Sequence, residues 1–257
     1  MHNTTPKTAY EQPLNERVRT FLRLEHLFIE ARHHLADPSH CSRSAAIRTT
    51  LDILSILARS DQRTEVLKEL DLQEEKLAAL HNRPGVDDNR LQTILDQIRK
   101  AAAKMQALPP NAALFIRDHE FLGSVINRSA IPGGTCGFDL PGFHRWLSLP
   151  PERQMKDINY WYRCIEPFEQ GIHLIIDLIR DSAYPAEKTA DDGVFVHVIE
   201  RQAQMVRVLV PAGASFYPEI SAGKHRCTVR FMQQDDVNKR PEQMHEAVKF
   251  RFALCAV

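Results

Sequence analysis

The apolar residues of this 257-residue chain change their spacing at one acidic stretch, residues 191–193. Before it they recur at i, i+3, i+4 and i+7, as within residues 91–98, which predicts amphipathic helices. After it they recur at every second position, which predicts strands. Helices followed by strands are typical of an α+β chain with segregated layers. We therefore expect a mainly helical domain over residues 14–184 and a smaller antiparallel β domain over residues 192–257.

Individual elements follow from the same periodicities and from proline and glycine signals. Helices are expected over residues 15–37, 42–58, 62–80, 88–105, 113–127, 141–148 and 151–182. Strands are expected over residues 194–199, 205–210, 224–232 and 248–254. The segment 8–13 precedes the first helix and is a candidate to join the β domain.

The charges of the chain balance, with 33 Lys and Arg against 33 Asp and Glu. No overall field therefore draws the protein to nucleic acid or to an anionic membrane, and charged recognition has to be local. No apolar stretch approaches the roughly 20 residues that a spanning helix needs, so we expect no membrane insertion. The five cysteines are far apart and no secretory leader precedes them, which favours reduced thiols in a cytoplasmic protein.

One expected strand sorts charge from apolar surface. Its outward positions carry Lys224, Arg226, Thr228 and Arg230, and its inward positions carry Cys227, Val229 and Phe231. A cationic row in a neutral chain indicates a partner with negative charge, but a solvated outer face of an antiparallel sheet gives the same pattern. On the last expected strand, Lys249 and Arg251 also alternate outward.

Enzyme motifs are nearly absent. Cys136 lies among glycines and could serve as a thiol nucleophile, but no His or Asp at a supporting spacing activates it. The pair Gly133-Gly134 lacks the remainder of a phosphate-binding loop. His33 and His34 diverge on a helix and cannot easily share one metal ion. We expect a non-enzymatic protein without metal or cofactor.

Several cations of the helical part remain ambiguous. Arg23 belongs to a helix with further arginines, and Arg59 follows a helix end, where a cation is stable for structural reasons alone. His144 suits a partner contact and an interior position equally well.

Five segments of the chain are informative together. They are EQPLNERVRTFLRLEHL (11–27), RTEVLKELDLQ (63–73), PGVDDNRL (84–91), SAIPGGTCGFDLPGFHRWL (129–147) and YPEISAGKHRCTVRFM (217–232). In this order they resemble the ZapD family of bacterial cell-division factors. The resemblance implies a cytoplasmic homodimer, recruited to the mid-cell division ring, that binds FtsZ and bundles its protofilaments.

The resemblance also implies a binding site. It suggests capture of the C-terminal tail of FtsZ, an acidic and apolar peptide, which needs cations beside an apolar groove. Lys224, Arg226 and Arg230 match the family's cationic strand and are the leading contacts. Secondary candidates are Arg23, Arg59, Arg117 and His144, of which Arg23 and His144 lie within the five segments. Glu120 departs from the basic residue that the resemblance implies there. A nucleic-acid adaptor using the same cationic face and a thiol enzyme at Cys136 stay open as alternatives.

Overall fold

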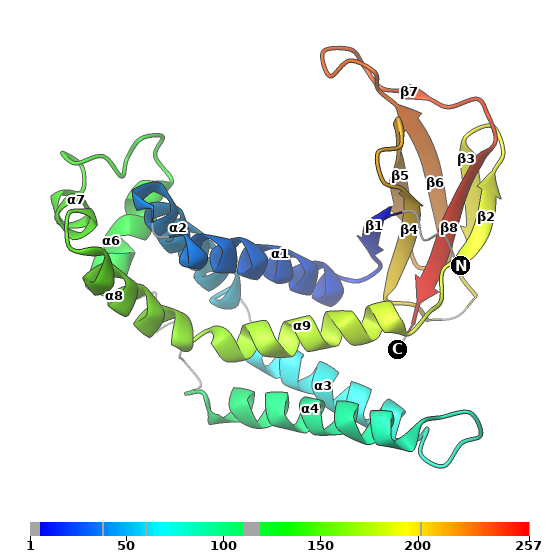
Figure 1. The fold of residues 1–257 in the computed structure, drawn as a ribbon, viewed down its shortest axis with the longest axis horizontal. Coiled ribbons are helices and arrows are strands. Elements are labelled where there is room, and N and C mark those ends of the chain that lie inside the picture. The colour runs from blue at the N-terminus through cyan, green and yellow to red at the C-terminus, as the bar shows by residue number, and fades with distance from the viewer. Residues whose placement is uncertain (1–5, 38, 60, 110–118, 201, 257) are drawn as a thin grey trace. The chain divides into compact units, whose positions relative to one another are not determined.

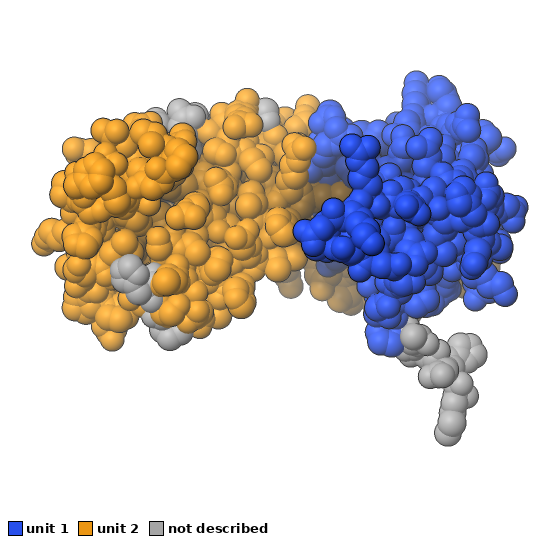
Figure 2. Space-filling model, turned by 90° about the horizontal axis from the view of Figure 1, so that it is seen from above, with its two compact units in different colours: residues 1–19, 176–257 blue, residues 20–175 orange. Residues whose placement is uncertain are grey.

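The computed structural model describes residues 6–37, 39–59, 61–109, 119–200 and 202–256 (Figure 1). The chain forms two compact units (Figure 2). Unit 1 contains residues 1–19 and 176–257, and unit 2 contains residues 20–175. The helices come first and the antiparallel sheets come last, so the expected α+β class is confirmed.

Helices build unit 2, and the first and last of them continue into unit 1. Their bounds are α1 Glu16–Ala36, α2 His40–Leu57, α3 Gln62–Ala78, α4 Asp88–Ala107, α6 Glu120–Ser129, α7 Pro141–Leu147, α8 Pro151–Arg163 and α9 Glu166–Asp181. The expected helix 113–127 begins outside the described residues, and its described part corresponds to α6. Capping carboxylates begin α3 and α4, where Asp61 accepts from the Thr64 N–H and Asp87 from the Asn89 and Arg90 N–H groups.

The single helix expected over residues 151–182 is wrong, because the chain breaks between α8 and α9. Pro167 is the reason: it lacks an N–H group, so the bond that would continue α8 to the Arg163 carbonyl cannot form. The Ile165 N–H instead bonds to the Tyr162 carbonyl over 2.9 Å, and the helix restarts at Glu166.

The described residues of unit 1 form two antiparallel sheets. Sheet A has the strand order β1-β4-β8-β2, formed by Lys7–Pro13, Met205–Pro211, Val248–Cys255 and Ala186–Ala190. Sheet B has the order β3-β6-β5, formed by Val194–Val198, Arg226–Gln233 and Phe216–Ala222, and the short β7, Glu242–Gln243, pairs with β6. The candidate segment at the N-terminus is thus a strand, which pairs along its whole length with β4.

The inner faces of the two sheets form one core. Its buried residues come from β2, β4, β6 and β8 and from Ile199: Ala190, Ile199, Val206, Val208, Val210, Cys227, Val229, Phe231, Val248, Phe250 and Phe252. Phe195 of β3 reaches the same core and packs edge-on against Phe250, with ring centroids 5.2 Å apart. Each sheet therefore has an outer face that points away from this shared core.

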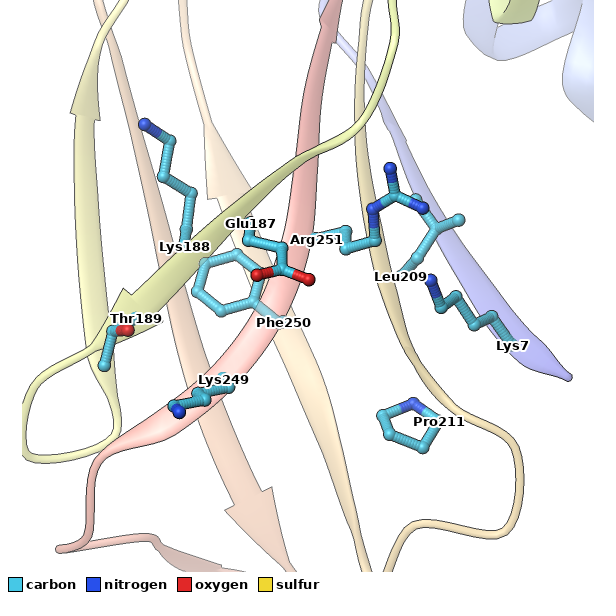
Figure 3. Close-up of a pocket in the computed structure, with 9 residues that line it drawn as sticks. All are labelled: Lys7, Glu187, Lys188, Thr189, Leu209, Pro211, Lys249, Phe250 and Arg251. Atoms are coloured by element: carbon cyan, nitrogen blue, oxygen red, sulfur yellow. The ribbon is translucent and has the colours of Figure 1, made fainter. Parts of the chain in front are cut away.

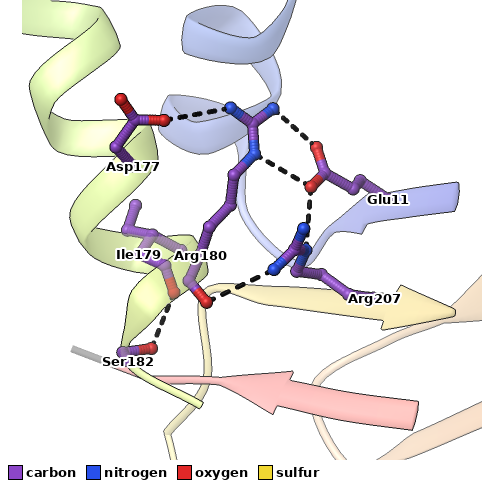
Figure 4. A network of polar contacts seen from close by, with 6 residues as sticks. All are labelled: Glu11, Asp177, Ile179, Arg180, Ser182 and Arg207. Atoms are coloured by element: carbon purple, nitrogen blue, oxygen red, sulfur yellow. Dashed lines mark hydrogen bonds and ion pairs between the residues drawn. The ribbon is translucent and has the colours of Figure 1, made fainter. Parts of the chain in front are cut away.

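An ion-pair network fixes β1, β4 and the end of α9 within unit 1 (Figure 4). The Glu11 carboxylate accepts from Arg180 over 2.8 and 2.9 Å and from Arg207 over 2.9 Å. Arg207 also donates to the Arg180 carbonyl over 3.4 Å. Burial by itself would raise the pKa of Glu11, but the hydrogen bonds and charges of Arg180 and Arg207 outweigh it and lower that pKa.

Candidate partner-binding face on sheet B

The strand β6 carries the expected alternation. Arg226 and Arg230 are exposed, whereas Cys227, Val229 and Phe231 are buried. Cys227 illustrates how apolar the inner side is, because burial raises the pKa of its thiol to about 11. The strand thus presents its cations outward from a neutral core.

Lys224 does not continue the cationic row, and this part of the expectation is wrong. The strand begins at Arg226, and Lys224 lies in the loop that joins β5 to β6. Ala222 pairs with Cys227, and the Gly223 N–H bonds to the Arg226 carbonyl over 2.9 Å. The chain must reverse here for the two strands to pair, so Lys224 is an exposed loop residue beside the row.

The strand register defines what surrounds the cations. Residues directly opposite each other in antiparallel strands point to the same face. Arg230 therefore stands between Val194 of β3 and Glu219 of β5, and Arg226 stands opposite Val198. Between the two arginines, Thr228 is flanked by Val196 and Ser221. We call these residues the sheet B face: Val194, Val196, Val198, Glu219, Ser221, Arg226, Thr228 and Arg230.

The valines of β3 form an apolar row parallel to the arginines. Val196 is 45% exposed and Val198 is 62% exposed, values that are high for β-branched side chains in a strand. This row was not among the site residues predicted from the sequence, although the strand sequence contains a signal for it. Phe195 and His197 alternate with the valines, and the larger aromatic rings occupy the core side.

β3 also offers an open edge. The Phe231 N–H bonds to the Gly193 carbonyl over 2.8 Å, and the Ile199 N–H bonds to the His225 carbonyl over 2.9 Å. The backbone N–H and C=O groups of the odd-numbered residues of β3 therefore point toward β6. Those of Val196, an even-numbered residue, point to the opposite edge of β3. Within the described ranges no strand pairs with that edge.

The cations of β6 and of the loop before it have no competing side-chain partners among the described residues. Across the part of the chain that the structure describes, no side-chain hydrogen bond or ion pair engages Lys224, Arg226 or Arg230. Glu219 stands opposite Arg230 only, so Arg226 has no carboxylate directly opposite it on β3 or β5. The sheet B face can therefore bind carboxylates and apolar side chains at the same time.

The secondary candidates lie in unit 2. Arg23 is exposed on α1, Arg59 is exposed after the end of α2, and His144 is exposed on α7. Arg117 lies outside the described residues. Glu120 begins α6, where a carboxylate is stabilised by the helix dipole. Among the described residues, no hydrogen bond or ion pair joins any two of these side chains.

The environment of Cys136 argues against an activated thiol. Its Sγ atom donates to Oδ2 of Asp139 over 3.5 Å, whereas an activated thiol has a cationic neighbour. Oδ1 of Asp139 lies 4.0 Å from Nη1 of Arg128, so the Arg128 guanidinium is directed at this carboxylate. His144 packs against Gly137, one residue beyond the cysteine.

The described residues contain no group of three or more His, Cys, Asp or Glu side chains that could hold a metal ion. Nor do they include a helix with the length and apolar character needed to cross a membrane.

Comparisons with known proteins agree along nearly the full chain. The family model for ZapD, described as a cell division protein, matches residues 22–230. The cell division protein ZapD of Methylococcus capsulatus (strain Bath) is 41% identical over 249 residues, which are 96% of this chain and 97% of that protein. ZapD of Enterobacter sp. (strain 638) is 37% identical over 246 residues, covering 96% and 98%. ZapD of Aromatoleum aromaticum is 32% identical over 253 residues, covering 98% of each chain.

Proposed function

Because the chain belongs to the ZapD family of cell division proteins, we propose that it is a non-enzymatic factor that binds FtsZ and bundles its protofilaments at the division ring. We further propose that it is a cytoplasmic homodimer and that its ligand is the C-terminal tail of FtsZ. The family membership supports the role in cell division. The sheet B face supports the recognition of an acidic and apolar peptide.

The observation that carries this proposal is the pairing of an exposed valine row with a cationic row. Arg226 and Arg230 are four residues apart on β6, which corresponds to about 13 Å along a strand. An extended peptide with carboxylates at a similar spacing can meet both guanidinium groups, while its apolar side chains cover Val196 and Val198. The open edge of β3 can add backbone hydrogen bonds to such a peptide.

Bundling then follows from valence. A dimer with one tail site in each subunit bridges two filaments, and weak sites become effective because every filament presents many tails. Sedimentation equilibrium of the free protein tests the dimer directly. A single species at the monomer mass, at the concentrations that bundle filaments, contradicts this mechanism.

The recognition mode is tested by co-sedimentation with FtsZ filaments. We expect Arg226→Glu/Arg230→Glu to weaken binding by at least tenfold, because each charge-assisted hydrogen bond contributes roughly 1.5–3 kcal/mol. Lys76→Glu/Lys100→Glu is the matched control: it changes the net charge equally, at exposed positions of α3 and α4. Circular dichroism checks that the variants fold. Unchanged pelleting of the arginine variant, or bundling of FtsZ filaments that lack their tail, refutes the proposed site.

The apolar row has its own test. Val196→Ser/Val198→Ser retains every charge of the sheet B face, so an effect on binding reports the apolar contribution alone. We expect a loss of about tenfold, since the two side chains are half exposed before binding. Binding that depends on salt but not on these valines would indicate a purely electrostatic contact.

A nucleic-acid adaptor remains the alternative use of the same face. One aromatic side chain does lie there, because Tyr217 pairs with Met232 in the register that places Glu219 opposite Arg230. A base could stack on it. A shift of single-stranded DNA in a gel that Arg226→Glu/Arg230→Glu abolishes would favour this alternative over the peptide.

A further inference from the structure

The outer face of sheet A contains a hollow of about 460 Å³ (Figure 3). Its lining combines cations, one carboxylate and apolar side chains: Lys7, Glu187, Lys188, Thr189, Leu209, Pro211, Lys249, Phe250 and Arg251. We call it the sheet A hollow. It lies on the side of the sandwich opposite to the sheet B face, because the inner faces of both sheets share one core.

The strand register arranges this lining in two rows. In one row Lys7 of β1 stands opposite Pro211 of β4, and Lys249 of β8 stands opposite Thr189 of β2, just beyond the last β4–β8 pair, Leu209 and Arg251. The next row runs from Ala9 through Leu209 to Arg251 and Glu187. Both rows therefore have an apolar residue of β4 in the middle, with cations on one or both sides.

Arg251 is held in position by the backbone. Its Nε and Nη2 atoms donate to the Pro185 carbonyl over 3.0 and 2.7 Å. One edge of the planar guanidinium is thereby used, and the N–H groups of its other edge can bind a carboxylate. Figure 3 shows this guanidinium and the Lys7 ammonium on the same side of the hollow, with Leu209 beside them, while the Lys188 ammonium points away.

The remaining cations are exposed. Lys7 and Lys249 make no side-chain hydrogen bond or ion pair within the described part of the chain. Lys7 belongs to β1 and Lys249 to β8, with β4 between them, so their Cα atoms are at least two strand spacings, about 10 Å, apart. A separation of at least this size suits two carboxylates on one chain better than a single phosphate, and Leu209 and Pro211 of β4 offer an apolar floor. The carboxylate of Glu187, which also lines the hollow, repels anions and so weakens the attraction of the hollow for a phosphate dianion.

We propose that the sheet A hollow is a second binding site for an acidic and apolar peptide segment, with Lys7, Lys249 and Arg251 as its cations. This inference rests on the proposed function, because the peptide in question is the same tail. A β unit with one site on each face bridges two tails without help from a second subunit. Bundling then draws on four sites in a dimer rather than two.

The test uses the full-length protein and a synthetic peptide with the sequence of the FtsZ tail. A water-soluble carbodiimide activates a peptide carboxylate as an O-acylisourea. The neutral amine of a lysine beside it then attacks the acyl carbon, loses a proton and displaces the urea to form an amide, and mass spectrometry identifies the lysine. Lys7 and Lys249 report the sheet A hollow, Lys224 reports the sheet B face, and the exposed Lys156 of α8 gives the background. We expect coupling at Lys7 or Lys249 at least about fivefold above Lys156, because binding raises the local carboxylate concentration.

The outcomes separate the two proposals. Coupling at Lys224 alone overturns the second site and leaves the proposed function in place. Coupling that nowhere exceeds Lys156 overturns tail recognition as well as the second site. Arg251→Gln is the matched variant: we expect it to reduce coupling at Lys7 and Lys249 several-fold and to leave Lys224 unchanged. An equal loss at all three lysines would show a general effect on the β unit and would count against the hollow as a distinct site.

Discussion

Glu11→Gln removes the anion that holds two arginines of unit 1. The carboxylate is 15% exposed, and the side chains of Arg180 and Arg207 are 24% and 18% exposed. The substitution retains the shape of the side chain but leaves two guanidinium groups around a neutral amide. The NH₂ group of this amide faces N–H donors and cannot accept hydrogen bonds from them. Breaking a fully buried pair in this way costs about 3–5 kcal/mol, and partial access of water reduces our estimate to about 2–3 kcal/mol.

Hydrogen exchange of the backbone amides is the suitable assay, because it resolves the free energy of opening element by element. Both tryptophans, Trp146 and Trp161, lie in unit 2, so their fluorescence does not report on β1 or β4. We expect protection of amides in β1 and β4 to fall by about 30- to 150-fold, since every 1.4 kcal/mol corresponds to a factor of ten.

Asp177→Asn is the matched control, because Asp177 also pairs with Arg180 but is 68% exposed and 3.5 Å away. We expect a loss of no more than about 0.5 kcal/mol. If Asp177→Asn costs as much as Glu11→Gln, or if Glu11→Gln leaves the protection of β1 unchanged, burial is not what makes the Glu11 network strong.

The same network predicts a pH dependence. The pKa of Glu11 in the folded protein lies below its ordinary value of 4.5. Its stabilisation is therefore fully present above pH 4.5 and is lost as the pH falls through the lowered pKa. In Glu11→Gln, we expect the protection of β1 to lose this part of its dependence on acid, and an identical acid profile in both proteins would contradict the assignment.

Two further substitutions test the packing of each unit. Gly193 has a φ of 68°, and a Cβ atom there would overlap the Met244 carbonyl. We therefore expect Gly193→Ala to destabilise unit 1 by about 3 kcal/mol. Gly213 is the control, because its φ is 77° but a Cβ atom there would meet open space, and we expect Gly213→Ala to cost about 1 kcal/mol. Hydrogen exchange of β3 measures both, and equal effects would exclude the overlap as the cause. In unit 2, the buried Gln154 donates to the carbonyls of Trp146, Leu147 and Leu149 and accepts from Arg43. We therefore expect Gln154→Leu to lower the free energy of unfolding by about 2–4 kcal/mol, measured by urea unfolding followed by tryptophan fluorescence. The exposed Gln92→Ala is the control and should cost less than about 0.5 kcal/mol. A Gln154→Leu variant as stable as the unmodified protein would show that these carbonyls do not need the amide.

The positions of most helices follow from local signals. Proline, capping carboxylates and a 3.6-residue period are read within a few residues, and the ends of α3 and α4 agree with them. The break before Pro167 was missed because the apolar stripe continues through it, although the missing N–H group ends the helix.

The short strands were harder to recognise. β2 has the sequence AEKTA and only Ala190 is buried, so it has almost no apolar alternation to detect. It becomes a strand because β8 pairs with all five of its residues. Tertiary pairing here overrides a weak local propensity.

A period of two assigns every residue of β6 to one face or the other whatever its neighbours are, so the charged side of this strand follows from the amino-acid order. The residues that lie beside those charges come from other strands and depend on the tertiary fold. Val198 stands next to Arg226, Lys7 and Arg251 lie on the two strands that flank β4, and Glu11 meets Arg180 because strands far apart in the chain are held in one register. That register depends on the packing of a common core, and periodicity within a single strand contains no information about the partner that this packing selects.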